Sequence, residues 1–281
     1  MLKRLLLIIS TAACLSGVHA QEHVLPNEKL LNAELLARGK KVWVNHCAGC
    51  HGANGDGQGP GAYGLNPKPR DLTTGIFKFG STPHGFLPTD EDLLRIIRQG
   101  VLGTSMPPFK LLPERDALAV IQYMKTFSPA WQDPTKHAAP VPVPPLPESF
   151  AKPESRLEMA KEGLPLFQAT CAPCHGATGD GSGAAAATLV DVWQNPIKPM
   201  DLRQPYIRRG RNLTDIYKVL VTGVNGTPMP NFGPAMTDDQ RWKIVAYVDH
   251  IRQAHKGRVE PLPVETAQPA TSAPASNDSF E

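Results

Sequence analysis

The chain of 281 residues is long enough for two modest domains, and its formal net charge is only +3. A nearly neutral chain lacks the concentrated basic surface that nucleic acid requires, so we expect no nucleic-acid partner. Hydrophobic residues make up 41% of the chain and aromatic residues only 6%, which leaves room in the cores for a bulky apolar prosthetic group.

The N-terminus, residues 1–20, is typical of an export signal. Lys3 and Arg4 precede a mostly apolar run that ends in small residues, which predicts cleavage after Ala20. The run is shorter than the roughly 20 apolar residues that span a bilayer, so we expect a periplasmic protein with no stable membrane span after cleavage. An uncleaved anchor and a lipidated Cys14 remain alternatives. Cleavage would leave 27 basic and 26 acidic residues, a net charge of +1.

The rest of the chain contains one unit twice, which predicts domains over residues 21–130 and 155–257. Segment 74–92 is longer in the first copy and segment 183–196 is longer in the second, as insertions in loops would be. Four segments recur in the same order: residues 47–51 and 171–175, 52–57 and 176–181, 69–72 and 199–202, and 103–109 and 226–232.

Apolar residues at helical spacing predict a helix at each end of both copies and a shorter one between them. Pro165 should limit or kink its helix, and Asp90 and Asp215 are placed to cap theirs. No segment shows the alternation of a strand, so the predicted fold is all-α with long ordered loops. The predicted helices span residues 30–45, 89–100 and 113–126 in the first copy, and 156–170, 213–223 and 238–251 in the second.

Two further segments lie outside the repeated unit. Residues 131–154 include the proline-rich run 140–147, which favours an extended, stiff linker that acts as a spacer or a strap across the domains. A binding motif for proline-recognising modules is the alternative for this run. Residues 258–281 are rich in Pro, Ala, Ser and Thr, which predicts a disordered tail.

Each copy contains Cys-x-x-Cys-His, the attachment motif of c-type haem. One helical turn places two thiols where they can form thioethers with the porphyrin vinyl groups, and the histidine supplies the proximal imidazole. Tetrahedral zinc and a redox dithiol are alternatives, but the pairs lie in different copies and both leave the histidines unexplained. We therefore expect two covalent haem c groups, attached at Cys47, Cys50, Cys171 and Cys174, with His51 and His175 as axial ligands.

A methionine lies at the same place in each copy, in the loop Gly-Thr-x-Met-Pro. Met106 and Met229 are therefore the expected sixth ligands, because a thioether is a soft ligand that raises the reduction potential of haem iron. The following proline stiffens the loop. A methionine that only fills the core is the alternative reading, and Met200 and His84 are competing ligands that do not follow the repeat.

These features resemble the class I cytochromes c in a tandem di-haem form, over about residues 25–130 and 155–255. The resemblance implies a small helical fold around each haem, with one haem edge exposed. It also implies that a glycine lets the first helix cross the last one closely, with aromatic residues packed nearby. The residues that carry it, besides the two haem motifs, are Gly39, Trp43, Met106 and Tyr123, and then Gly163, Phe167, Met229 and Tyr247.

The predicted function is electron transfer between a redox protein donor and an acceptor, with both irons ligated by histidine and methionine and no catalysis by the chain itself. Arg70 is interpreted as a partner of a haem propionate or as part of a surface salt bridge. Two alternatives remain. One is a di-haem peroxidase, which needs an open iron site. The other is the cytochrome subunit of a larger dehydrogenase or reductase complex.

Overall fold

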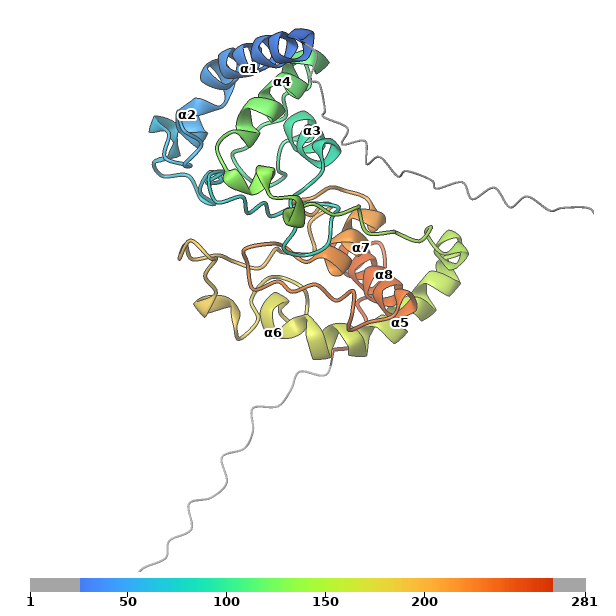
Figure 1. The fold of residues 1–281 in the computed structure, drawn as a ribbon. Helices are drawn as coiled ribbons and strands as arrows, with labels where there is room; N and C mark the ends of the chain where they lie inside the picture. The colour runs from blue at the N-terminus through green and yellow to red at the C-terminus, as the bar shows by residue number, and fades with distance from the viewer. Residues whose placement is uncertain (1–25, 265–281) are drawn as a thin grey trace, which may run out of the picture.

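The computed structural model describes residues 26–264, which form two helical domains stacked one on the other (Figure 1). The predicted signal, Cys14 and residues 265–281 of the predicted tail lie outside the described residues, whereas residues 258–264 of that tail are described. Within 26–264 there is no β-strand, only two isolated bridges between loop residues, so the prediction of an all-α fold is confirmed. No helix in this part of the chain is both long and apolar enough to cross a membrane.

The first domain contains two long helices, two short ones and long ordered loops. Its last helix lies against its first, and the haem motif follows the first helix directly (Figure 1). Each predicted helix of this copy is present. The bounds are α1 Pro26–His46, α2 Ala48–His51, α3 Asp90–Gln99 and α4 Glu114–Lys125, with a short 3-10 turn at Pro60–Ala62.

The second domain repeats this arrangement. The sequence predicts that Pro165 limits or kinks the first helix of this copy. That helix continues through Pro165 and ends at Thr170. The last helix extends four residues beyond its predicted end at residue 251, and the short chain segment after it packs back on the domain through Leu262. The bounds are α5 Pro153–Thr170, α6 Ala172–His175, α7 Leu213–Thr222 and α8 Asp238–His255, with a 3-10 turn at Ala186–Thr188.

Capping boxes begin α3 and α7, the ten-residue helices of the two copies. Thr89 caps α3 together with Asp92, whereas Asp90, the residue expected to cap it, binds side chains of α4 instead. Asn212 caps α7, and Asp215 closes that box from inside the helix, near the start as the sequence predicts.

A glycine lies at each crossing of the first and last helices. A Cβ added to Gly39 would lie 2.2 Å from the carbonyl oxygen of Ala119, and one added to Gly163 would lie 2.0 Å from that of Lys243. Real Cβ atoms do not approach backbone oxygen so closely, so only glycine permits these crossings. The close approach that the family resemblance implied is confirmed.

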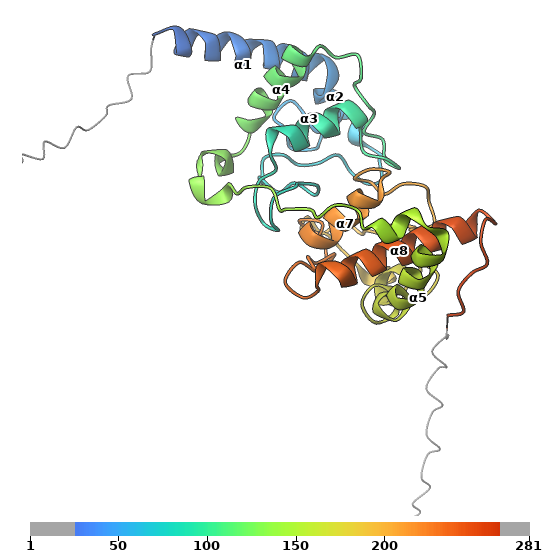
Figure 2. The ribbon, with the colours of Figure 1, turned by 90° about the vertical axis from the view of Figure 1, so that its right-hand side faces the viewer.

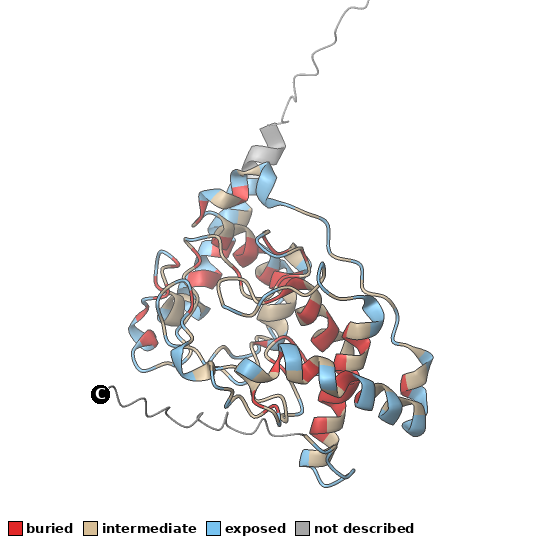
Figure 3. Cartoon of the chain, turned by 90° about the horizontal axis from the view of Figure 1, so that it is seen from below, coloured by how far each residue is buried: buried red, intermediate tan, exposed pale blue. Residues whose placement is uncertain are grey.

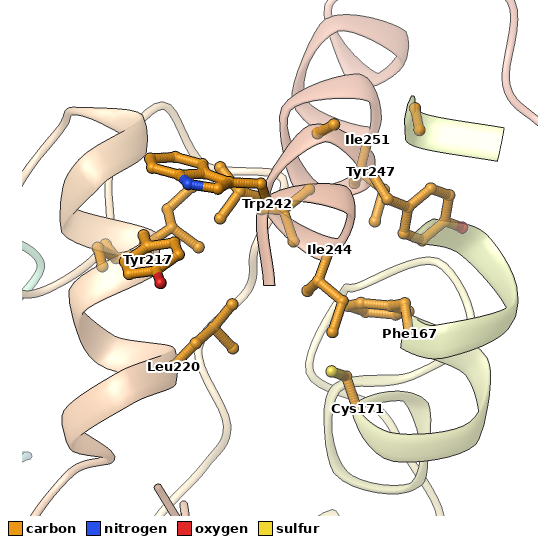
Figure 4. Close-up of a cluster of buried hydrophobic side chains, with 14 of the residues drawn as sticks. Phe167, Cys171, Tyr217, Leu220, Trp242, Ile244, Tyr247 and Ile251 are labelled. Atoms are coloured by element: carbon orange, nitrogen blue, oxygen red, sulfur yellow. The ribbon is translucent and has the colours of Figure 1, made fainter. Parts of the chain in front are cut away.

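The cores lie along these crossings, and Figure 3 shows the buried positions concentrated on the helices. In the second domain, Trp242 of α8 stacks on Tyr217 of α7, with ring centroids 4.4 Å apart (Figure 4). Phe167 of α5 faces Tyr247 at 5.1 Å. Aromatic pairs at these distances stabilise the contact between helices beyond simple burial of area.

Segment 131–154 lies across both domains as a strap. Trp131 packs in the first core, 5.5 Å from Phe77, and Phe150 packs in the second, 5.7 Å from Trp242. The backbone between them forms hydrogen bonds of 2.8 and 2.9 Å with the loop before α3. Of the two roles expected for a linker here, the structure supports the strap.

The domains also contact each other directly, and α7 lies at their junction (Figure 2). Arg209 of the second domain is only 3% exposed, and its guanidinium lies 3.6 Å from the carboxylate of Asp92 in the first. Arg95 donates to the carbonyl of Arg209 at 3.0 Å, and the amide of Gly85 donates to Asn225 at 3.0 Å. The contact therefore includes specific polar pairs.

Candidate haem sites

The last four residues of each Cys-x-x-Cys-His motif form α2 and α6, each a single turn after a long helix, and Cys47 and Cys171 are the residues that directly precede these turns. The amide of His51 donates to the carbonyl of Cys47 at 2.9 Å, and that of His175 donates to Cys171 at 2.8 Å. The cysteines and the histidine of a motif therefore lie on one turn, as thioether attachment and axial ligation require. All four of these cysteines are unbridged.

The described residues contain no cluster of three or more His, Cys, Asp or Glu side chains that could hold a metal ion. The two cysteine pairs lie in different domains, so they cannot share a tetrahedral zinc. Burial, with a smaller effect of Cys50, raises the pKa of the Cys47 thiol to about 11, and burial also raises the pKa of Cys171. A raised pKa makes Cys47 and Cys171 poor redox nucleophiles.

A backbone carbonyl orients each motif histidine. Nδ1 of His51 lies 3.0 Å from the carbonyl oxygen of Arg70, and Nδ1 of His175 lies 3.1 Å from that of Met200. A carbonyl only accepts, so Nδ1 carries the hydrogen and Nε2 keeps its lone pair for a metal. Burial lowers the pKa of both histidines, which favours the neutral ring that binds iron.

The recurring segments 69–72 and 199–202 provide this acceptor in both copies. The side chains at the second position differ, arginine in one copy and methionine in the other, because the position acts through its main chain. The sequence shows the recurrence of Pro-x-Asp-Leu but not this role. Only the fold brings the segment against the histidine.

A cavity of about 450 Å³ opens beside α6 in the second domain. Cys171, Cys174 and His175 line it together with Met229. Its other walls are mostly apolar side chains, which come from α5, α7 and α8 and from the loops between helices, and Figure 4 shows the sulfur of Cys171 pointing toward the side where Leu220 lies. The residues expected to hold the second haem therefore meet around one apolar space.

The cavity wall carries charge of one sign. Lys78, Lys198, Arg208 and Arg209 line it, and no aspartate or glutamate does. The side chain Nε of Arg208 is buried without a hydrogen-bond partner in the described structure. An apolar space with cationic side chains at its wall fits a flat apolar group with acidic ends, and haem with its propionates is such a group.

The two methionine loops are closed by the same three hydrogen bonds. In the first copy, Oγ1 of Thr104 accepts from the amide of Met106 at 3.1 Å and donates to the carbonyl of Val101 at 2.8 Å. The amide of Val101 donates to the carbonyl of Met106 at 3.1 Å. The second copy repeats these bonds at 3.2, 2.8 and 3.2 Å among Thr227, Met229 and Val224. The threonine of Gly-Thr-x-Met-Pro thus holds the methionine backbone in place.

An arginine from a neighbouring helix holds the chain after each methionine, but the helix differs between copies. Arg98 reaches this chain from α3 in the first domain, and Arg241 reaches it from α8 in the second. The carbonyls that accept from them are those of Phe109, Lys110 and Leu112 in the first copy, and of Phe232, Gly233 and Met236 in the second. The repeat in the sequence does not reveal that this arginine comes from a different helix in each copy.

The competing ligands have other contacts. Nδ1 of His84 lies 3.2 Å from the carbonyl of Thr222, so this histidine takes part in the junction with the second domain. Met200 lines the second cavity, as Met229 does, and its carbonyl is the partner of His175. Arg70, expected near a propionate or on the surface, places its guanidinium over the ring of Trp193.

Comparison with known proteins agrees with the repeated haem motif. A family model described as cytochrome C oxidase, cbb3-type, subunit III matches residues 34–124 and matches again over residues 158–248. The chain belongs to this family. It is accordingly a c-type cytochrome with two tandem domains and two covalently bound haem c groups, and the predicted family and cofactor are confirmed.

This chain is also similar to one curated protein and to one solved structure. The chain is 29% identical over 107 residues, 38% of its length, to a cbb3-type cytochrome c oxidase subunit FixP of Sinorhizobium medicae strain WSM419. That match spans about a third of the FixP chain, 35%. A solved structure, the Kuenenia stuttgartiensis reducing HAO-like protein complex Kustc0457/Kustc0458, is 36% identical with a TM-score of 0.69. The similarity covers 76% of this chain and 95% of that one. The name of the first describes a subunit of an oxidase, and the name of the second describes a protein complex.

Proposed function

We propose that this cytochrome is a periplasmic di-haem electron carrier in which both irons are ligated by histidine and methionine. The cysteine pairs of α2 and α6 attach the haems, His51 and Met106 ligate the first iron, and His175 and Met229 ligate the second. A bound haem supplies a one-electron couple between ferric and ferrous iron. The units that hold the two haems are residues 21–130 and 155–257, with 131–154 as the strap.

One observation carries most of this proposal. In both copies the motif histidine donates through Nδ1 to a carbonyl, and a threonine-closed loop presents a methionine. In the second domain, histidine and methionine line the same cavity. A neutral imidazole and a thioether that fill both axial positions leave no open site for a substrate, which favours electron transfer over catalysis.

The experiment is optical spectroscopy of the oxidised and reduced protein, with haem content from the pyridine haemochrome assay. We expect two haems per chain, low-spin spectra and the weak sulfur-to-iron band of the oxidised form. Met106→Ala alone should remove about half of that band, and Met229→Ala alone should remove the other half. One haem per chain, or a high-spin component that takes up peroxide in the unsubstituted protein, would contradict the proposal. The second outcome would favour a di-haem peroxidase.

We further propose that the chain works as the cytochrome subunit of an oxidoreductase complex. The names of FixP and of the Kuenenia complex support this, because both describe a part of a larger redox assembly. Purification under mild conditions should then yield the cytochrome together with a large catalytic subunit. Recovery of a free 30 kDa cytochrome from the periplasmic fraction, reduced by soluble donors, would favour an independent carrier instead.

A further inference from the structure

We propose that the first domain completes the second haem site: Lys78 reaches into the cavity of the second domain and, with Arg208, binds a carboxylate of the haem held there. The proposal rests on the function proposed above, because it assumes a haem on Cys171, Cys174 and His175. It adds that one haem site of this chain is shared between the two domains.

The shared wall is a matter of geometry. Among the residues that line the second cavity, Lys78 and Phe79 come from the first domain, and all others come from the second. Both belong to segment 74–92, the stretch that is longer in the first copy than in the second. This insertion is therefore the part of the first domain that reaches the second haem site.

The charges around Lys78 are unbalanced. Its Nζ lies 3.3 Å from the carboxylate of Asp191, and its side chain is only 11% exposed. The guanidinium of Arg208 has no acidic partner among the described residues, and its Nε is buried without a hydrogen bond. Arg209, the neighbouring cation, is already paired across the junction with Asp92 at 3.6 Å. Lys198, the fourth cation of this wall, is exposed to solvent. Lys78, with Asp191 as its carboxylate partner, and Arg208, with none among the described residues, are thus the partly buried cations left at this wall.

The unfavourable burial of these cations favours the binding of an additional anion at this wall. Burial and the charges of Arg70 and Arg208 lower the pKa of Lys78 to about 8, against the opposing effect of Asp191. Burying several cations beside one carboxylate is unfavourable unless further negative charge offsets them. A haem carboxylate directed at this wall would supply that charge, and its hydrogen bonds to lysine and arginine would be charge-assisted.

A redox consequence follows. Reduction adds one electron to the iron, so a nearby positive charge favours the ferrous state and raises the potential. Removal of Lys78 leaves the carboxylate less neutralised, which disfavours the added electron. The potential of the second haem therefore depends on a residue of the first domain and on the contact between the domains.

The test is redox titration of the full-length holoprotein with Lys78→Gln. We expect the equilibrium constant for reduction of the second haem to fall about threefold to tenfold, where tenfold is ~59 mV for one electron. The first haem should be unchanged. Arg208→Gln should act in the same direction, and the double variant should show less than the sum of the two shifts. Lys40→Gln, which removes the same charge from an exposed position on α1, is the matched control.

The two haems can be separated in a Met106→His background, because histidine in place of methionine lowers the potential of the first haem. Lys78→Arg keeps the charge and should keep the potential, which covers the case in which Lys78→Gln does not fold. With two haems bound, a shift for Lys78→Gln no larger than that for Lys40→Gln would overturn the proposal. A single haem per chain in the unsubstituted protein would instead overturn the proposed function on which it rests.

Discussion

The guanidinium of Arg70 lies 3.9 Å from the centroid of the Trp193 ring, and the carbonyl of the same arginine orients His51. The Trp193 ring in turn lies 3.0 Å from where a Cβ on Gly226 would be, in the loop that carries Met229. One pair of residues thus links the proposed axial histidine of the first haem to the loop that carries Met229 in the second domain. A movement at the junction would therefore shift residues at both sites.

Trp193→Ala should loosen this junction. The substitution removes a cation–π contact, worth roughly 0.5–2 kcal/mol, together with the packing against Gly226. Hydrogen exchange should speed up several-fold at two amides, that of Val192, which donates to Gly226, and that of Gly85 across the junction. Trp193→Phe keeps an aromatic face and should show a smaller effect. Unchanged exchange in the alanine variant would mean that other contacts hold the domains.

The sequence predicts what the two copies share and misses much of what differs between them. The helices, the haem motifs and the methionine loops recur, so the pattern identifies them. Trp193 and Lys78 lie in the two insertions, and their partners are more than a hundred residues away. No periodicity or spacing encodes such contacts. The acceptors of the motif histidines were missed for another reason, because a carbonyl acts the same way under arginine or methionine.

Gly39→Ala and Gly163→Ala should destabilise their own domains. The added methyl would meet the carbonyl oxygens of Ala119 and Lys243 at 2.2 and 2.0 Å, so the helices must separate. Overpacking of this kind costs about 1–3 kcal/mol, which urea unfolding would measure as a lower midpoint at a similar slope.

Gly49→Ala is the control for both, because nothing lies within 4 Å of a Cβ at that position. This control lies inside the first haem motif, so its haem content should be checked and should be unchanged. Equal stability of all three variants would show that the helix crossings can relax at no cost.

Thr227→Val should weaken the proposed methionine ligation at the second haem. Valine keeps the shape of threonine but can neither accept from the amide of Met229 nor donate to Val224, and each such bond contributes about 0.5–1.5 kcal/mol. The sulfur-to-iron band should lose part of its intensity, and the potential of that haem should fall. Thr227→Ser, which retains the hydroxyl, should restore both. A valine variant with a full band would show that the proline after Met229 is sufficient to hold the loop.

Acid should open the junction through Asp92. Burial acts to raise the pKa of this carboxylate, but hydrogen bonds from the amide and hydroxyl of Ser81, at 2.6 and 2.7 Å, and the charge of Arg209 outweigh it. The pKa is therefore lower in the folded protein than in the unfolded chain. The stability that Asp92 contributes is fully present above the unfolded pKa, about 4, and is lost as pH falls through the folded pKa.

Hydrogen exchange at the amide of Gly85 and urea unfolding, both followed from pH 6 to pH 2.5, would measure this loss. Asp92→Asn should be less stable at pH 6 and should lose less stability on acidification, because the titrating group is gone. Glu91→Gln, at an exposed position next to it on α3, should follow the unsubstituted protein. If Asp92→Asn keeps the full pH dependence, the acid-sensitive step lies at another carboxylate. The pairing of Asp92 with Arg209 would then be a consequence of domain contact rather than one of its causes.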